Sequence, residues 1–182
     1  MMERSTKFFS LSGVAGIMAG IYALVGAFIV WRILDFDIGN DSTVMLKLIG
    51  LAAAVLLLAI GTAFFLSNKK ANKRGEKFWN NTSKRFAINM AVPLVAGGLF
   101  ILVLLSKDMI ALALASTLIF YGLALYTASK FTYEEVRSMG LIQILLGLVA
   151  AYFDEYGLLF WALGFGVVNI IYGIYLHYRY ER

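Results

Sequence analysis

Residues that could carry chemistry are few in this sequence. The chain has no cysteine and a single histidine, His177, so thiol nucleophiles and cysteine-bound metals are excluded. Glu134 and Glu135 are adjacent, and neighbouring side chains on a helix point in different directions, so the two carboxylates form a poor acid–base pair. They are predicted to lie on a solvated loop. No phosphate-binding loop or nucleophile-elbow motif occurs. The sequence therefore predicts a protein that is not an enzyme and that holds no metal or cofactor.

Uncharged polar residues within apolar stretches are the remaining candidates. Asn169 shares a helix face with Gly166 and Gly173, so its amide is expected to point where another helix approaches closely. Two interpretations are open. The amide either makes a hydrogen bond between helices, or it lines a polar cavity for a small solute together with Gln143 and Tyr172.

A stripe of small residues lies near the start of the chain. Gly16 and Gly20 are four residues apart, and Ser12 precedes them by one turn. Small residues at this spacing let helix backbones approach closely in lipid. The stripe predicts a helix-packing seam, either within one chain or between two copies.

The elements that must position these residues are membrane spans. Apolar residues make up 61% of the chain and charged residues only 15%, which is typical of a protein embedded in a bilayer. A crossing helix needs about 20 mostly apolar residues, whereas barrel strands would alternate polar and apolar ones. The predicted fold class is an all-α polytopic transmembrane helix bundle in one domain. The fifth span is short, so it is expected to require a locally thinned bilayer or interfacial aromatic residues. The six predicted spans are about 11–33, 44–66, 86–105, 109–128, 139–153 and 156–177.

The basic residues indicate how the chain is oriented. With six spans both termini lie on one side, and that side holds 13 of the 16 lysine and arginine residues. The positive-inside rule therefore predicts that the N- and C-termini are cytoplasmic. The same bias accounts for the net charge of +5, so the charge gives no reason to expect nucleic-acid binding.

Residues 67–85, predicted as a cytoplasmic loop, are the most basic segment, and Phe78 and Trp79 are interleaved with the charges. Each basic residue near an anionic leaflet contributes about 1 kcal/mol to binding. The segment is predicted to lie on anionic lipid headgroups as a topology anchor, with docking of a partner as the alternative. Its seven basic residues are Lys69, Lys70, Lys73, Arg74, Lys77, Lys84 and Arg85.

A faint repeat runs through the last four spans. Tyr121-Gly122 matches Tyr172-Gly173 at an offset of 51 residues, and Gly97 and Gly147 precede the two pairs at similar distances. Tandem helical hairpins would produce this pattern, and so would chance in an apolar chain.

These glycine-punctuated hairpins, with short outer turns and a basic face, resemble the HdeD-type family of small bacterial membrane proteins, most clearly over residues 93–182. The turn Ser106-Lys107-Asp108 lacks the proline that this family often has there. The chain is also similar to other six-helix bacterial membrane proteins for which the likeness implies no activity. The resemblance implies a bacterial inner-membrane location and an association with acid stress, and it supplies no functional residues.

Three functions follow from these observations. The missing chemistry favours a non-enzymatic integral membrane protein with an accessory, regulatory or stress-related role, acting through lipid, a membrane partner or a second copy. The alternative is a transporter or channel for a small uncharged solute, favoured by the repeat and by Asn169. An enzyme acting on lipid would require Tyr133, Glu134, Glu135 and His177 to form a cluster.

Overall fold

Six helices long and apolar enough to cross a membrane form the fold in the computed structural model, which describes residues 13–36, 42–73 and 81–180. Within these ranges there is no strand. The structure confirms the predicted all-α helix bundle. The first five spans are α1 (Gly13–Phe36), α2 (Ser42–Lys73), α3 (Asn81–Leu105), α4 (Ile110–Ala128) and α5 (Glu135–Tyr152).

The sixth span is interrupted. It consists of α6 (Gly157–Trp161), the π-helix η3 (Ala162–Val168) and α7 (Asn169–Tyr180). Two short 3-10 turns, η1 (Ser129–Phe131) and η2 (Asp154–Tyr156), lie between the spans. Because a π-helix bonds each residue to the one five positions away, η3 has a wider turn than the helices on either side.

The observed helices extend beyond several predicted boundaries. α5 begins at Glu135, four residues before the predicted start, so its 18 residues reach about 27 Å. α2 continues to Lys73 and α3 begins at Asn81, so much of the predicted loop over residues 67–85 is helical. The physical reason is that hydropathy marks only the part of a helix inside hydrocarbon. Lysine and arginine are good helix formers that continue the helix into the headgroup region.

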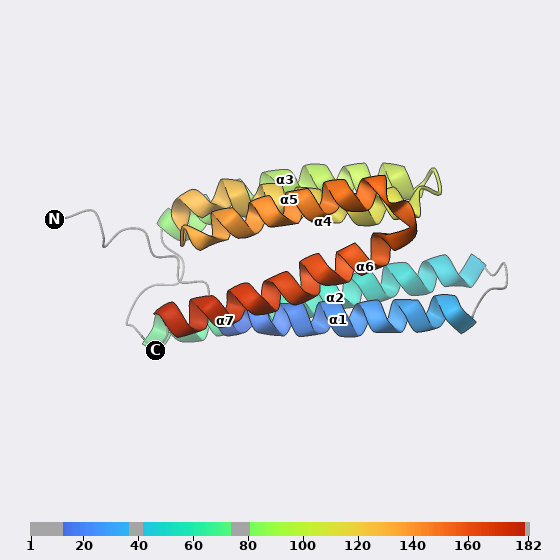
Figure 1. The fold of residues 1–182 in the computed structure, drawn as a ribbon. Helices are drawn as coiled ribbons and strands as arrows, with labels where there is room; N and C mark the ends of the chain where they lie inside the picture. Colours follow the sequence, from blue (N-terminus) through green and yellow to red (C-terminus); the bar gives the residue numbers. More distant parts are fainter. Residues whose placement is uncertain (1–12, 37–41, 74–80, 181–182) are drawn as a thin grey trace.

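The helices form two layers (Figure 1). In one layer α4 contacts both α3 and α5, and in the other α1 contacts both α2 and α7. The sixth span joins the layers, because α6 packs on α4 and α5 while α7 packs on α1. The last four spans therefore do not form two equivalent hairpins, since α3 and α4 share a layer whereas α5 and α7 belong to different layers.

Glycines bring the helices of each layer into backbone contact. A Cβ atom added at Gly173 of α7 would lie 2.6 Å from the Ile17 nitrogen and 2.7 Å from the Gly13 carbonyl oxygen of α1. A Cβ atom at Gly122 of α4 would lie 2.6 Å from the carbonyl oxygen of Gly140 in α5. Only glycine permits such an approach. The matched glycines of the sequence repeat thus serve different neighbours, α5 in one case and α1 in the other.

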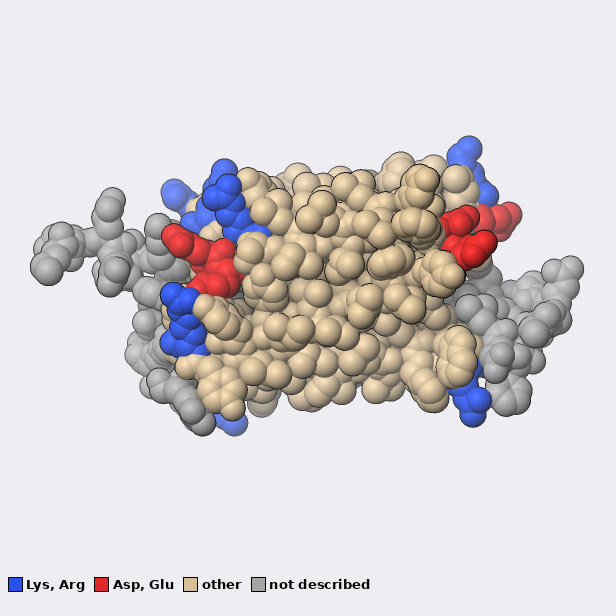
Figure 2. All heavy atoms as spheres, viewed as in Figure 1, with Lys and Arg blue, Asp and Glu red and all other residues tan. Residues whose placement is uncertain are grey.

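Charged side chains gather at the two ends of the bundle and leave an uncharged band between them (Figure 2). We call the end that holds the first residue of α1 and the last of α7 the termini end, and the opposite one the far end. From the direction of each span, the described charged residues at the termini end are Lys69, Lys84, Arg85, Lys130, Arg137, Arg179, Glu134 and Glu135, and those at the far end are Arg32, Lys107, Asp108, Asp154 and Glu155.

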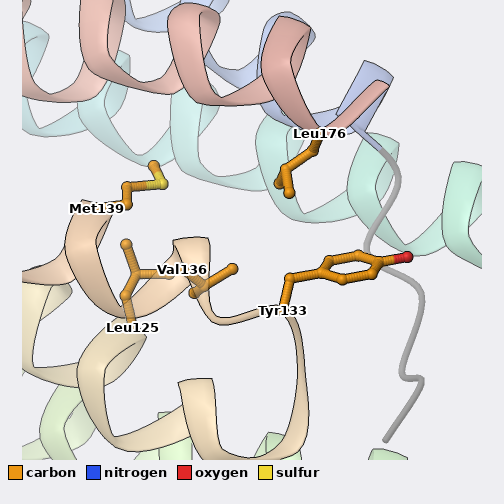
Figure 3. Close-up of a cluster of buried hydrophobic side chains, with 5 residues drawn as sticks. All are labelled: Leu125, Tyr133, Val136, Met139 and Leu176. Carbon is orange, nitrogen blue, oxygen red and sulfur yellow. The ribbon is translucent and has the colours of Figure 1, made fainter. Parts of the chain in front are cut away.

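Hydrophobic contacts join the two layers. Near the termini end, Leu176 of α7 points toward side chains of α4, of α5 and of the turn between them (Figure 3). A second buried cluster contains Ala115 and Leu118 of α4 with Ala150 of α5, and aromatic residues of α6 and η3 pack against it. The members of the first cluster are Leu125, Tyr133, Val136, Met139 and Leu176. These contacts fix the sixth span against α4 and α5.

Candidate functional site

A series of polar contacts follows the surface where the sixth span meets α4 and α5. Each contact joins a polar side chain of α4 or α5 to a side chain or backbone carbonyl of the sixth span. We call this set the interlayer polar seam. Its side chains are Thr117 and Tyr121 of α4, Ser138 and Gln143 of α5, and Trp161, Asn169 and Tyr172 of the sixth span.

Asn169 is the first residue of α7 and is only 4% exposed. Its Nδ2 donates to the Phe165 carbonyl at 2.9 Å and lies 3.4 Å from the Gly164 carbonyl. The hydroxyl of Tyr121 in α4 donates to Asn169 Oδ1 at 3.2 Å. Both ends of the amide therefore have partners within the protein. Of the two open interpretations, this geometry matches the hydrogen bond between helices.

Gln143 of α5 is fully buried, with 0% exposure. Its Nε2 donates to the Gly164 carbonyl at 2.8 Å, which ties α5 to the centre of η3. A side chain at position 164 would not fit, because a Cβ atom there would lie 2.6 Å from Gln143 Oε1 and 2.4 Å from a methyl group of Leu118. Gln143 and Asn169 thus approach the same carbonyl oxygen from two helices.

Tyr172 does not share this site. Its hydroxyl lies 2.9 Å from Ser138 Oγ of α5, so the predicted trio separates into two places, and Tyr121 takes the position next to Asn169. Trp161 forms a third contact, in which Nε1 donates to Thr117 Oγ1 at 3.1 Å. No local pattern in the sequence indicates the Tyr121 contact, because 48 residues separate it from Asn169.

An ion pair closes the seam at the termini end. The Glu135 carboxylate lies 3.2 Å from an Arg179 guanidinium nitrogen and accepts hydrogen bonds from the Tyr180 hydroxyl at 3.0 and 3.2 Å. Tyr133 stacks on Tyr180 with ring centroids 4.1 Å apart, and Arg179 also donates to the Tyr175 hydroxyl. We call this group the Glu135 clasp; it joins α5 to α7.

The clasp corrects the expectation that Glu135 lies on a solvated loop, since its side chain is only 16% exposed. The prediction failed because it began the fifth span at residue 139, whereas Glu135 is the first residue of α5, where an acidic group interacts favourably with the helix dipole. Glu134 is exposed, and the His177 ring lies edge-on to Tyr178. The Glu135 carboxylate thus pairs with Arg179 and Tyr180 of α7.

Glu135→Gln is expected to lower the thermal unfolding midpoint by a few degrees at low salt. The neutral amide keeps the shape of the side chain but removes its attraction to Arg179. The difference from the unmodified protein should shrink as salt rises, because salt screens the charge of Arg179, whose side chain is 55% exposed. Unfolding in detergent, followed by circular dichroism, measures both effects. Glu134→Gln, one residue away and exposed, is the control, and an equal shift in the two variants would contradict a role for the clasp.

The stripe of small residues on α1 lies against η3 and α7 of the same chain. A Cβ atom at Gly16 would lie 3.3 Å from the Gly173 α-carbon, and one at Gly20 would lie 2.7 Å from the Gly166 carbonyl oxygen. Ser12 lies outside the described residues. Because α7 begins with Asn169, this packing also fixes the backbone that carries the Asn169 amide.

The basic residues of segment 67–85 divide between two helices. Lys69, Lys70 and Lys73 belong to the last turns of α2, while Lys84 and Arg85 belong to the first turns of α3. Arg74 and Lys77 lie outside the described residues. Lys130 and Arg137 add further positive charge at the same end, and Arg137 donates to the Tyr126 hydroxyl at 3.2 Å.

The fold and the seam define a class, that of polytopic helical membrane proteins whose interior polar groups join helices. Over residues 13–36, 42–73 and 81–180, no three His, Cys, Asp or Glu side chains form a group that could hold a metal ion. No protein-family model matches the chain, and no curated protein or solved structure is significantly similar to it. The resemblance to HdeD-type proteins therefore stays an expectation.

Proposed function

We propose that the chain is a non-enzymatic integral membrane protein of the bacterial inner membrane. Its role is accessory, regulatory or stress-related and is exerted through lipid, a membrane partner or a second copy. The observation that supports this proposal is how the interior polar groups are used. Tyr121 bonds to Asn169, Ser138 to Tyr172, and the Gln143 amide nitrogen to the Gly164 carbonyl. Groups used in this way hold helices together rather than exchanging partners with a passing solute.

The proposed orientation has both termini in the cytoplasm. Six of the described basic residues lie at the termini end and two at the far end, and an excess of basic residues marks the cytoplasmic side. The termini end would then face the cytoplasmic leaflet, whose anionic lipids attract basic residues near the membrane surface. Contact with anionic headgroups through Lys69, Lys84 and Arg85 is part of the proposal.

The full-length protein is expected to retain more phosphatidylglycerol than phosphatidylcholine in native mass spectrometry from mixed micelles. Replacing Lys69, Lys84 and Arg85 together with glutamine should reduce the retained phosphatidylglycerol several-fold, because each charge contributes about 1 kcal/mol. Replacing Arg32 and Lys107 at the far end with glutamine is the control and should leave retention unchanged. If the two sets of substitutions have equal effects, lipid is not bound preferentially at the termini end.

A transporter or channel for a small uncharged solute is the second candidate, and one observation favours it. The sixth span contains the π-helical turn η3 where it crosses between the two layers, and π-helical turns within helices are frequent at functional sites.

Solute flux distinguishes the two functions. Proteoliposomes should take up glycerol and urea no faster than protein-free liposomes in stopped-flow swelling assays if the accessory role is right. Faster uptake that is lost in Asn169→Leu, without a change in the melting temperature of that variant, would establish the transporter instead. An unchanged melting temperature matters because a residue that only packs helices would lower it.

A further inference from the structure

The side-chain carbonyl of Gln143 has an unusual environment. Of the described residues, Gln143 alone has a buried side-chain nitrogen or oxygen without a hydrogen-bond partner, and this atom is Oε1. Rotating the amide by half a turn would not satisfy it, because Nε2 would leave the Gly164 carbonyl and two oxygens would face each other. The contact at 2.8 Å therefore fixes Oε1 as the acceptor that lacks a donor.

The surroundings make a bare acceptor unfavourable. Leu118, Ala115 and Ala150 pack in the same region of α4 and α5 and are completely buried. An amide oxygen in such an apolar interior is strongly disfavoured without a donor, and lipid cannot supply one. Buried groups of this kind in proteins are usually satisfied by an internal water molecule.

The polar atoms around η3 limit what the donor can be. The Gly164 carbonyl accepts from Gln143 Nε2 at 2.8 Å and lies 3.4 Å from Asn169 Nδ2, so polar groups meet at this turn of η3. The described acidic and basic residues lie near the ends of the spans, so none of them is available as a counter-charge beside Gln143. The hydrogen-bond donor to Gln143 Oε1 is therefore expected to be neutral rather than charged. Packing around the amide is tight, because a Cβ atom at position 164 would lie 2.6 Å from Oε1 and 2.4 Å from a methyl group of Leu118, so only a very small donor is compatible with it.

We propose that Gln143 Oε1 and the η3 segment form a binding site for one neutral O–H donor of the size of a water molecule, within the membrane interior. The occupant is water, which donates to Oε1 and lies beside the Gly164 carbonyl. The site also gives the π-helical turn a role, since the wider turn holds the Gly164 carbonyl where both amides reach it. The proposal requires no transport and stands whichever of the two functions holds.

Gln143 is the only glutamine in the chain, which permits a test without substitution. The full-length protein is labelled with glutamine carrying ¹³C at Cδ and ¹⁵N at Nε2 and is placed in lipid bilayers. Nuclear magnetic resonance should detect magnetisation transfer from water to the Gln143 side-chain amide. In infrared spectra the labelled carbonyl should absorb at the lower frequency of a hydrogen-bonded group. This frequency should rise when the film is dried and should return to its first value on rehydration.

Two results would overturn the proposal. One is a carbonyl band at the free frequency in the hydrated film, which would mean an empty site. The other is a low-frequency band that drying does not move and that receives no magnetisation from water, which would mean a donor from the protein.

Two variants sharpen the test. Tyr121→Phe removes the neighbouring bond to Asn169 and should leave the Gln143 signals unchanged. Gly164→Ala places a methyl group 2.6 Å from the position of Oε1 and should abolish the transfer from water. If Gly164→Ala does not fold, the measurements on the unmodified protein decide the question alone.

Discussion

Gly173→Ala is expected to destabilise the folded protein by about 1–3 kcal/mol, although it adds only one methyl group. The new Cβ atom would lie 2.6 Å from the Ile17 nitrogen and 2.7 Å from the Gly13 carbonyl oxygen. Both are backbone atoms, so no side chain can rotate away, and α7 must separate from α1. That separation would also move Asn169, one turn earlier on α7.

A glycine without neighbours provides the control for this prediction. No atom of another helix lies within 4 Å of a Cβ atom added at Gly98 of α3. Because alanine is the better helix former by about 1 kcal/mol, Gly98→Ala should be neutral or slightly stabilising. Reversible unfolding in mixed micelles measures both variants. Equal destabilisation of the two would mean that the cost arises within each helix and not from contact between α1 and α7.

The spans could be predicted from the sequence because the thickness of hydrocarbon sets their length. The small-residue stripe likewise indicated close packing, and Gly16 and Gly20 lie against α7. The helix ends were harder to place, as Glu135 illustrates. A charged residue stops the hydropathy signal but does not stop a helix, so the Glu135 clasp lay beyond the predicted start of its span.

The arrangement of the layers could not be predicted, for a different reason. Lipid tails are as apolar as the helices, so no hydrophobic pattern selects which helix packs on which. Contact is decided by local shape, such as the glycines that meet between α4 and α5. The pairing of Tyr121 with Asn169 follows from that arrangement and leaves no periodic trace in the sequence. The π-helix η3 also has no recognisable sequence pattern, because its seven residues are all apolar or glycine.

Asn169→Leu is expected to cost about 1–3 kcal/mol of folding free energy, and its coupling to Tyr121 is the sharper prediction. The substitution removes the acceptor of the Tyr121 hydroxyl, and a polar group left without a partner in a buried site costs more than the bond itself contributes. Tyr121→Phe alone should cost about 0.6–1.7 kcal/mol, the range for hydrogen bonds between membrane helices.

The double variant decides between a packing bond and independent roles for the two residues. With Asn169 already replaced by leucine, Tyr121→Phe should cost nothing further or should restore stability, because it removes the orphaned hydroxyl. The four proteins of this cycle are compared by unfolding in the same micelles. Additive losses would contradict the packing bond, since residues that do not act on each other lose stability independently. A coupled loss, together with unchanged solute flux in all four proteins, would tie the Asn169 amide to the assembly of the two layers.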